Sequence, residues 1–398
     1  MSKTYKIILY VLSLLAVASV TFLVTVIWTT ERVESQYVSD LSNDVVDAKM
    51  RRIHAMLENY FIDDYDPQTV QTAAADGAAS AMITATGDPW SYYISAEDMS
   101  EYEELMTNSY VGIGVTIEEV HSGMKVMGLT AGGPAEEAGV LIGDILTHVE
   151  GQSAAELGLD ETKKLVQGKE GSYVNLRFDR DGTPYDVQVQ RRTIISDVAT
   201  MEMLDGKIAL ITIKNFDLHC AEQTLECIDL ALAQNASALL FDVRFNGGGL
   251  KDEMVPILDV LLPEGTIFSS VDYLGTEETD YSDAAFINLP MAVLVNADSY
   301  SAAEFFAAAL QQYDMAQVIG VQTSGKGNFQ YTLPLGDGSA VALSVGKYFM
   351  PDGTSLTGVG VTPDVEMDLN YDDYVSLYYG TLSHEEDEQL QAALEVLK

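Results

Sequence analysis

A serine at the start of a helix and a lysine between two glycines are the side chains of this sequence best suited to nucleophilic chemistry. Ser301 follows the apolar run MAVLVN, which predicts a buried strand, and precedes an amphipathic stretch that predicts a helix. Lys326 lies in TSGKGNFQ, where the flanking glycines let backbone or substrate approach closely. A hydroxyl becomes a useful nucleophile beside a base, and a desolvated lysine with a lowered pKa can be that base.

Histidine is the usual partner of a nucleophilic serine, but the histidines here have unsuitable contexts. The sequence has five of them, His54, His121, His148, His219 and His384, and only the last two lie beyond Val198. Neither has a sequence context that suggests an orienting carboxylate. The sequence therefore favours Lys326 as the base, with Gln330 returning on the same turn or strand to orient the amine.

Two further segments carry features of an acyl-transfer site, and each has a structural alternative. Ser301 and Glu304 form the S-x-x-E pattern of a capping box, which is compatible with catalysis because free N–H groups at a helix start favour an oxyanion. FDVRFNGGGL, residues 241–250, predicts a strand followed by a glycine turn. Its N–H groups can supply half of an oxyanion hole, or the glycines can serve only tight packing.

A phosphate-binding loop is an alternative interpretation of the lysine segment. Gly320, Gly325 and Lys326 match the G-x-x-x-x-G-K pattern. However, Gly327 replaces the Ser or Thr that would bind magnesium, and NFQYTLPL predicts a strand where a helix should begin. Nucleotide binding is therefore disfavoured.

Composition and charge exclude several functions. The 21 basic and 61 acidic residues give a formal net charge of −40, which opposes binding to nucleic acid or anionic lipid through a basic patch. Cys220 and Cys227, the two cysteines, fall in one predicted helix with roughly 10 Å of rise between them. They are too far apart for a disulfide bond.

The N-terminal sequence predicts a membrane anchor. Residues 7–28 contain no charge and are long enough to cross a bilayer as a helix. Lys3 and Lys6 precede this run, so the positive-inside rule places the tail, 1–6, in the cytoplasm and the rest outside. We expect a single-pass protein of the cell membrane with its body on the extracytoplasmic side. A cleaved signal peptide is the alternative, and it also exports the body.

The pattern changes twice along the exported body. Residues from Tyr37 to about Thr86 have helical periodicity, and from Tyr110 short strands surround two modest helices, at 134–138 and 157–167. Beyond Val198, apolar strands alternate with helices, which predicts a layered α/β domain with parallel strands.

At this point the residues resemble the carboxyl-terminal processing proteases, also called tail-specific proteases, which are Ser/Lys peptidases with an inserted PDZ domain. The resemblance extends from about Tyr37 to Asp368 and preserves the order of several motifs. The nucleophile block matches SAAE at 301–304, the base block matches GKG and Gln330, and the oxyanion turn matches DVRFNGGGL at 242–250. GPAEEAGVLIGDIL, residues 133–146, resembles the helix and strand of the PDZ domain. Asp298 and Tyr300 depart from the small residues common in the family, which should narrow the approach to the nucleophile.

The resemblance implies a fold and domain order. We expect a layered α/β core of the ClpP/crotonase type with an inserted β-rich PDZ domain, an N-terminal helical region and one transmembrane helix. The expected bounds are 1–6 for the tail, 7–28 for the anchor, 36–97 for the helical region, 98–194 for the PDZ domain, 195–370 for the peptidase core and 371–398 for an acidic helical region.

The resemblance also implies roles for particular residues. Ser301 is the expected nucleophile, Lys326 the general base and Gln330 the residue that positions it. The expected oxyanion donors are the N–H groups of Ala302 and of Gly248 or Gly249. The expected carboxylate-binding loop of the PDZ domain contains Tyr110, Val111, Gly112, Ile113 and Gly114.

The predicted function is therefore a membrane-anchored serine endopeptidase that cleaves exported proteins near their C-termini and recognises their tails through its PDZ domain. The alternative is an inactive PDZ scaffold that binds tails without cleaving them. No metal or organic cofactor is implied. The family resemblance suggests a homodimer, and the substrate and the activating signal stay open.

Overall fold

The computed structural model describes residues 45–398, which divide into two compact units, one ending at Ala81 and the other spanning Met82–Lys398. The first unit contains α2 (Val45–Tyr60) and most of α3 (Pro67–Thr84), and neither helix buries a side chain. This pair corresponds to the predicted N-terminal helices. The predicted anchor, 7–28, lies outside the described residues. Within 45–398, no helix is long and apolar enough to span a bilayer.

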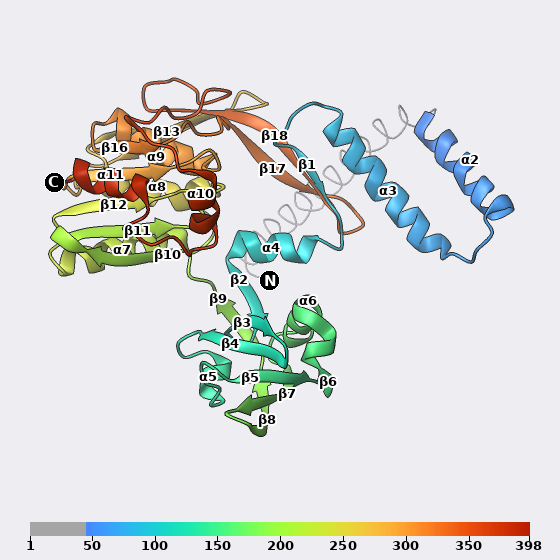
Figure 1. Cartoon of the computed structure of the whole chain (residues 1–398). Coiled ribbons are helices and arrows are strands. Elements are labelled where there is room, and N and C mark those ends of the chain that lie inside the picture. The colour runs from blue at the N-terminus through green and yellow to red at the C-terminus, as the bar shows by residue number, and fades with distance from the viewer. Residues whose placement is uncertain (1–44) are drawn as a thin grey trace, which may run out of the picture. The chain divides into compact units, whose positions relative to one another are not determined.

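The second unit is built around a six-stranded sheet (Figure 1). The strand order is β10 (Ala199–Leu204), β11 (Ile208–Ile213), β12 (Ala238–Asp242), β15 (Met291–Val295), β16 (Ala316–Gly320) and β19 (Val365–Glu366). All neighbours pair in parallel except β10, which is antiparallel to β11. The predicted alternation of strands and helices beyond Val198 is confirmed by this parallel arrangement.

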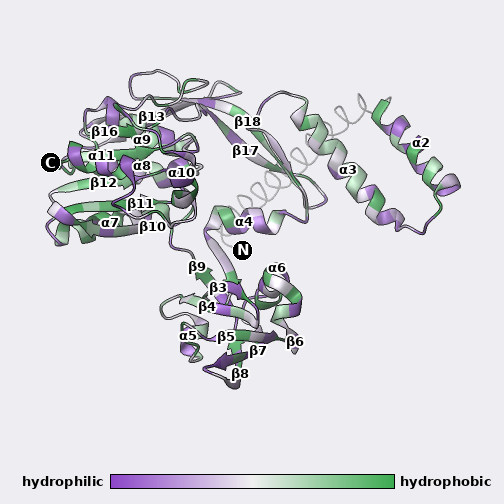
Figure 2. Ribbon diagram, in the orientation of Figure 1, coloured by the Kyte–Doolittle hydropathy of each residue, from purple (hydrophilic) through white to green (hydrophobic). Residues whose placement is uncertain are grey.

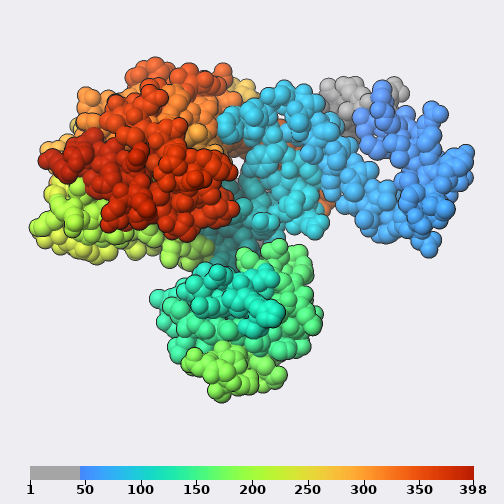
Figure 3. Space-filling view, in the orientation of Figure 1, coloured from blue at the N-terminus to red at the C-terminus, as the bar shows by residue number. Residues whose placement is uncertain are grey.

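Helices bury both faces of this sheet, which explains its nearly continuous apolar strands. Three helices, α7 (Cys220–Ala233), α8 (Lys251–Leu261) and α9 (Ala302–Gln312), contribute side chains to the larger core cluster, and α11 (Glu388–Val396) contributes to the smaller one with alternate strand residues. Figure 2 shows apolar residues along the central strands. Figure 3 shows the C-terminal residues, in red, spread over one face of the core. The strands whose ends carry the candidate site are therefore anchored in a buried core.

A second, antiparallel sheet flanks the first, and the sequence pattern did not predict it. It contains β1 (Tyr92–Ile94), β18 (Ala340–Phe349), β13 (Gly265–Asp272) and β14 (Glu277–Ser282), with β17 (Asn328–Pro334) also paired to β18. Because β1 pairs with β18, the chain just after α3 is fixed beside the strand pair that follows the lysine segment.

The β-rich module has its own sheet and core. Its strand order is β3 (Val115–Val120), β4 (Gly123–Leu129), β5 (Ile145–Val149), β7 (Tyr173–Arg180) and β8 (Thr183–Gln190), with β6 (Gln152–Ser153) on β5. Two helices, α5 (Pro134–Glu137) and α6 (Ala154–Val166), accompany it. The short pair β2 (Ser109–Gly112) and β9 (Arg192–Ile195) lies where the chain enters and leaves the module. Strand β3 is an edge strand, so a peptide can add beside it.

Two short helices complete the second unit. Helix α4 (Met99–Thr107) precedes β2, and α10 (Tyr371–Tyr378) follows β19. The ring of Phe245, in the glycine turn after β12, packs edge-on against Tyr374 and Tyr378 of α10. The C-terminal region therefore supports one of the loops of the candidate site.

Candidate active site

Ser301 lies in the turn between β15 and α9, at the carboxyl end of the parallel sheet. Its backbone has φ 59° and ψ −124°, a conformation that costs free energy for any residue except glycine. The Ser301 N–H donates to Oε2 of Glu304 at 3.0 Å, which stabilises this turn. A serine held in a sharp strand-to-helix turn is the arrangement of a nucleophile elbow, and the next N–H, of Ala302, begins the helix.

Glu304 joins the serine turn to the lysine segment. Its side chain is fully buried, and Oε2 also accepts the Lys326 N–H at 2.9 Å. The other oxygen, Oε1, accepts the Gly325 N–H at 2.7 Å and the Thr323 hydroxyl at 2.5 Å. One carboxylate thus fixes the backbone of both predicted catalytic residues. Sequence reasoning found Glu304 as a capping residue and as part of the nucleophile block. It did not predict the bonds to the lysine segment, because contacts across the sheet end are not visible in a local pattern.

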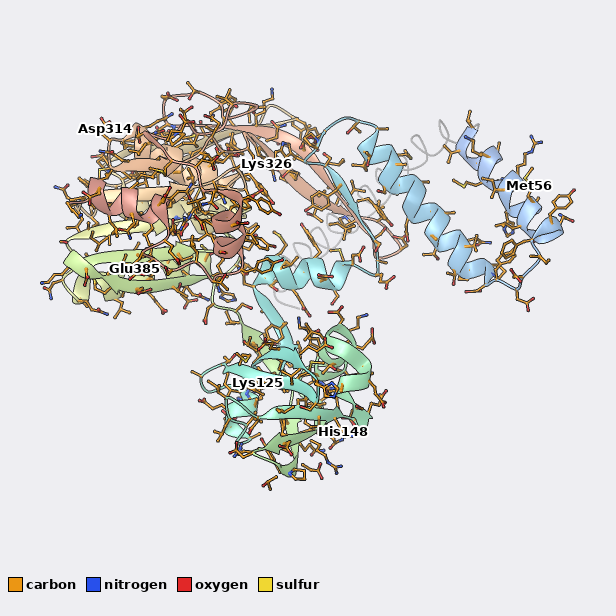
Figure 4. All side chains as sticks on the ribbon, in the orientation of Figure 1. Met56, Lys125, His148, Asp314, Lys326 and Glu385 are labelled. Carbon is orange, nitrogen blue, oxygen red and sulfur yellow. The ribbon has the colours of Figure 1, made fainter. Side chains whose placement is uncertain are left out.

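The amine of Lys326, labelled in Figure 4, lies among aromatic rings. Its Nζ is 5.1 Å from the ring centroid of Trp90 and 5.7 Å from that of Tyr300. Burial lowers the pKa of Lys326, while the negative charges of Asp88 and Glu304 oppose this shift. The net decrease increases the fraction of neutral amine, which is the form that can accept a proton.

Tyr348 of β18 gives a further link between the two segments. Its hydroxyl donates to the Lys326 carbonyl oxygen. Burial raises the pKa of this fully buried phenol, and a hydrogen bond with the Ser301 side chain partly offsets the effect. Tyr348 therefore touches both the nucleophile and the backbone of the lysine.

The glycine turn after β12 packs directly against Ser301. A Cβ placed on Gly248, at φ +88°, would lie 2.7 Å from the Ser301 Cβ and 2.8 Å from the Ala302 nitrogen. The Gly248 N–H donates to Oδ1 of Asn246 at 2.8 Å. Within residues 45–398, the structure gives the N–H of Gly249 no hydrogen-bond partner. The turn therefore brings the Gly248 backbone next to the serine, followed by the Gly249 amide.

Buried charges hold the glycine turn to the C-terminal region. Arg244 donates to Asp242 at the end of β12 and to Asp387, which begins α11, with N···O distances of 2.6 and 2.8 Å. The three side chains are 13% exposed or less. Asp242 and Arg244 are motif residues whose partner, Asp387, was not predicted from sequence.

Gln330 lies on β17, and its amide bonds to residues other than Lys326. Its Nε2 donates to the Ser344 hydroxyl at 3.0 Å and to the Asn328 carbonyl oxygen at 3.2 Å. Direct positioning of the lysine by Gln330 stays a prediction. In the loop that includes Asp88 and Trp90, the indole ring lies beside the lysine amine, and the Asp88 charge acts on that amine.

The predicted carboxylate-binding loop lies at the start of the β-rich module. Tyr110, Val111 and Gly112 belong to β2, and Ile113 and Gly114 connect β2 to the edge strand β3. The Ile113 side chain is buried, and its carbonyl oxygen accepts the Ala135 N–H at 2.9 Å. The loop is therefore fixed directly before an edge strand, and its binding of a terminal carboxylate stays a prediction.

The structure does not support the phosphate-binding loop as an alternative function of the lysine segment, and the hollow in the core lies away from Ser301. The segment after Lys326 continues into β17, so the helix that a phosphate-binding loop requires does not follow it. A hollow of about 420 Å³ includes Met291, Ala316 and Leu397. Met291 and Ala316 begin β15 and β16, whereas Ser301 follows the other end of β15.

The fold and this site define a serine peptidase with an inserted PDZ domain, and comparisons with known proteins agree. The model of peptidase family S41 matches residues 207–367, and the PDZ domain model matches residues 111–190. The chain belongs to peptidase family S41 and is a serine protease of its carboxy-terminal processing group.

Similar proteins cover most of the chain. The carboxy-terminal processing protease CtpA of Bacillus subtilis (strain 168) is 31% identical over 348 residues, which are 87% of this chain and 74% of the relative. A "Probable CtpA-like serine protease" of Staphylococcus aureus (strain COL) is 30% identical over 371 residues, 92% of this chain and 73% of the relative. Among solved structures, the photosystem II D1 C-terminal processing protease is similar, with a TM-score of 0.45 and 24% identity, over 80% of this chain and 86% of that one.

Proposed function

We propose that this protease cleaves exported proteins near their C-termini with a Ser301/Lys326 dyad, after its PDZ domain has bound their tails. The observation that carries the proposal is the Glu304 carboxylate, which binds the backbone N–H groups of both residues. A carboxylate that served only as a helix cap would not need the bonds to the lysine segment.

The proposed mechanism follows from the placement of these groups. The Ser301 hydroxyl oxygen attacks the scissile carbonyl carbon while the neutral Lys326 amine takes the hydroxyl proton. The ammonium then protonates the leaving amine, the C–N bond breaks, and an acyl-enzyme remains. Water attacks the acyl-enzyme, again giving its proton to Lys326, and the released serine oxygen recovers a proton.

The negative charge on the tetrahedral oxygen requires two donors. We assign these to the N–H groups of Ala302 and Gly249. The Gly248 N–H is the weaker candidate because it already donates to Asn246. The Ala302 N–H lies at the start of α9, where the helix dipole also favours a negative charge.

The PDZ domain is proposed to bind substrate tails by strand addition. The tail would pair with the edge of β3 while its terminal carboxylate meets the N–H groups of the loop 110–114. The proposed site of action is the extracytoplasmic side of the cell membrane, supported by the uncharged run 7–28. A homodimer through the terminal regions is also proposed, since α2 and α3 expose apolar residues such as Ile53 and Met82, respectively.

The test is cleavage of a mixture of protein substrates with free C-terminal tails by the full chain in detergent, with products identified by mass spectrometry. Wild type should release C-terminal fragments, and Ser301→Ala and Lys326→Ala should each release none while remaining folded. Equal cleavage by wild type and Ser301→Ala would disprove the assignment of the nucleophile. A Lys326→Ala variant with wild-type turnover would remove the lysine from the mechanism. Protease accessibility in intact cells would test the proposed orientation.

A further inference from the structure

The loop between α3 and β1 forms one wall of the lysine environment. The Trp90 ring faces Lys326 Nζ and lies 5.5 Å from the Tyr300 ring, centroid to centroid. Asp88 lies in the middle of this loop and organises it. Its Oδ1 accepts the Trp90 N–H at 3.1 Å, and its Oδ2 accepts the Ser91 hydroxyl at 2.5 Å. The Asp88 carboxylate therefore fixes the loop that carries the ring.

Hydrogen bonds connect the same carboxylate to Gln330. The Gln330 amide donates to the Ser344 hydroxyl on β18 at 3.0 Å. The Ser344 N–H in turn donates to the Ser91 hydroxyl oxygen at 2.9 Å. A continuous chain thus runs from β17 through β18 to the loop.

We propose that Asp88 is a positioning residue of the peptidase, which fixes the Trp90 ring against the Lys326 amine and sets the pH range of activity, with Gln330 connected to it through Ser344 and Ser91. This inference rests on the proposed Ser/Lys mechanism. This proposal gives the loop before β1 a role in the reaction. The catalytic motifs recognised from sequence, in contrast, lie in the peptidase core.

Several groups face Lys326, and only some are negative. Asp88 on the loop and Glu304 on α9 both favour the protonated amine, and burial favours the neutral one. Tyr300 contributes a ring, as does Trp90, and the Tyr348 hydroxyl contacts the Lys326 carbonyl oxygen. Burial alone would raise the pKa of Asp88, but hydrogen bonds from Ser344, Ser91 and Trp90, together with the Lys326 charge, lower it. Asp88 is therefore negative when the lysine titrates.

The test is the pH dependence of kcat/KM for Asp88→Asn, measured with the peptide that wild type cleaves fastest. Activity should rise with pH as Lys326 loses its proton. Removing the Asp88 charge makes the protonated amine less favourable, so the midpoint of this rise should move to lower pH. Asp88→Glu keeps the charge and should keep the midpoint closer to that of wild type.

A matched control and a second variant separate this role from a structural one. Asp337→Asn removes the same charge from the β17–β18 turn, where Asp337 accepts bonds from Ser339, and should leave the midpoint unchanged. Ser344→Ala keeps both charges but breaks the link to Gln330, and should lower kcat with little change in KM. A folded Asp88→Asn variant whose pH midpoint equals that of wild type would overturn the inference. If Asp88→Asn does not fold, a wild-type kcat in Ser344→Ala would overturn it instead. Neither result would affect the Ser301 assignment, which depends on loss of cleavage in Ser301→Ala.

Discussion

Replacing Glu304 by glutamine tests the claim that one carboxylate aligns both catalytic residues. Glutamine has nearly the same shape but offers one oxygen and one NH₂ group. If the glutamine oxygen still accepts hydrogen bonds from the N–H groups of Ser301 and Lys326, its NH₂ group faces the Thr323 hydroxyl and the Gly325 N–H. The Thr323 hydroxyl can rotate to accept, but the Gly325 N–H then faces a donor.

The expected loss of stability can be worked out from these bonds. An unpaired buried N–H costs about 1–3 kcal/mol, and three bonds that change from charge-assisted to neutral lose about 1 kcal/mol each. Removing a buried charge offsets part of this loss, since a buried carboxylate carries a desolvation cost. We therefore expect Glu304→Gln to lower the free energy of unfolding by about 2–4 kcal/mol.

The loss of activity should exceed what this destabilisation explains. A misplacement of 1 Å near the reacting atoms costs roughly 100-fold in rate, and Glu304 fixes both segments. At a temperature where circular dichroism shows Glu304→Gln to be folded, kcat should fall by about 100-fold or more. The control is Glu222→Gln, at the equivalent third position of α7, where the side chain is 73% exposed. It should change stability by less than about 0.5 kcal/mol. Wild-type kcat in folded Glu304→Gln would refute the reasoning.

Three other substitutions test separate features. Gly248→Ala places a methyl group against Ser301 at a positive φ, so kcat should fall by about 100-fold, whereas near-normal turnover in a folded variant would contradict this packing. Burial and the Glu253 charge raise the pKa of Asp217 to about 7, so its carboxylate destabilises the fold increasingly as pH rises from about 4 to 7. Asp217→Asn should accordingly stabilise the protein by roughly 2–4 kcal/mol at pH 8 and little at pH 4, and denaturant unfolding that gave the same gain at both values would refute the shift. Asp387→Asn removes one partner of buried Arg244 and should cost about 3 kcal/mol in the same measurement, while an unchanged midpoint would show that Asp242 alone suffices.

The parts of the fold that could be predicted from sequence are those with a strong local pattern. The apolar runs at 208–213, 238–242 and 291–295 form buried parallel strands, and the helices between them follow the expected periodicity. The second sheet could not be predicted in this way. Its strand β14, EETDYS, is polar, and β1 pairs with β18 across more than half of the chain.

The candidate site also has residues that could be predicted from sequence and residues that could not. Ser301, Lys326 and the glycine turn are recognisable because each lies in a short motif with its own backbone requirement. Asp88, Ser344 and Asp387 have no such motif. Each matters through a partner distant in sequence, as when Asp387 meets Arg244, and tertiary packing alone brings such pairs together.

The contacts of Glu304 show that Ser301 can cap the helix and still be the proposed nucleophile. A capping box needs Glu304 to accept the Ser301 N–H, and this bond is present. The same oxygen also accepts the Lys326 N–H, a bond that helix capping does not require. The positive φ of Ser301 costs free energy that a serine cap in an ordinary extended conformation would avoid. The cap therefore stabilises a strained turn, and the bond to the lysine segment fixes that turn relative to the proposed base.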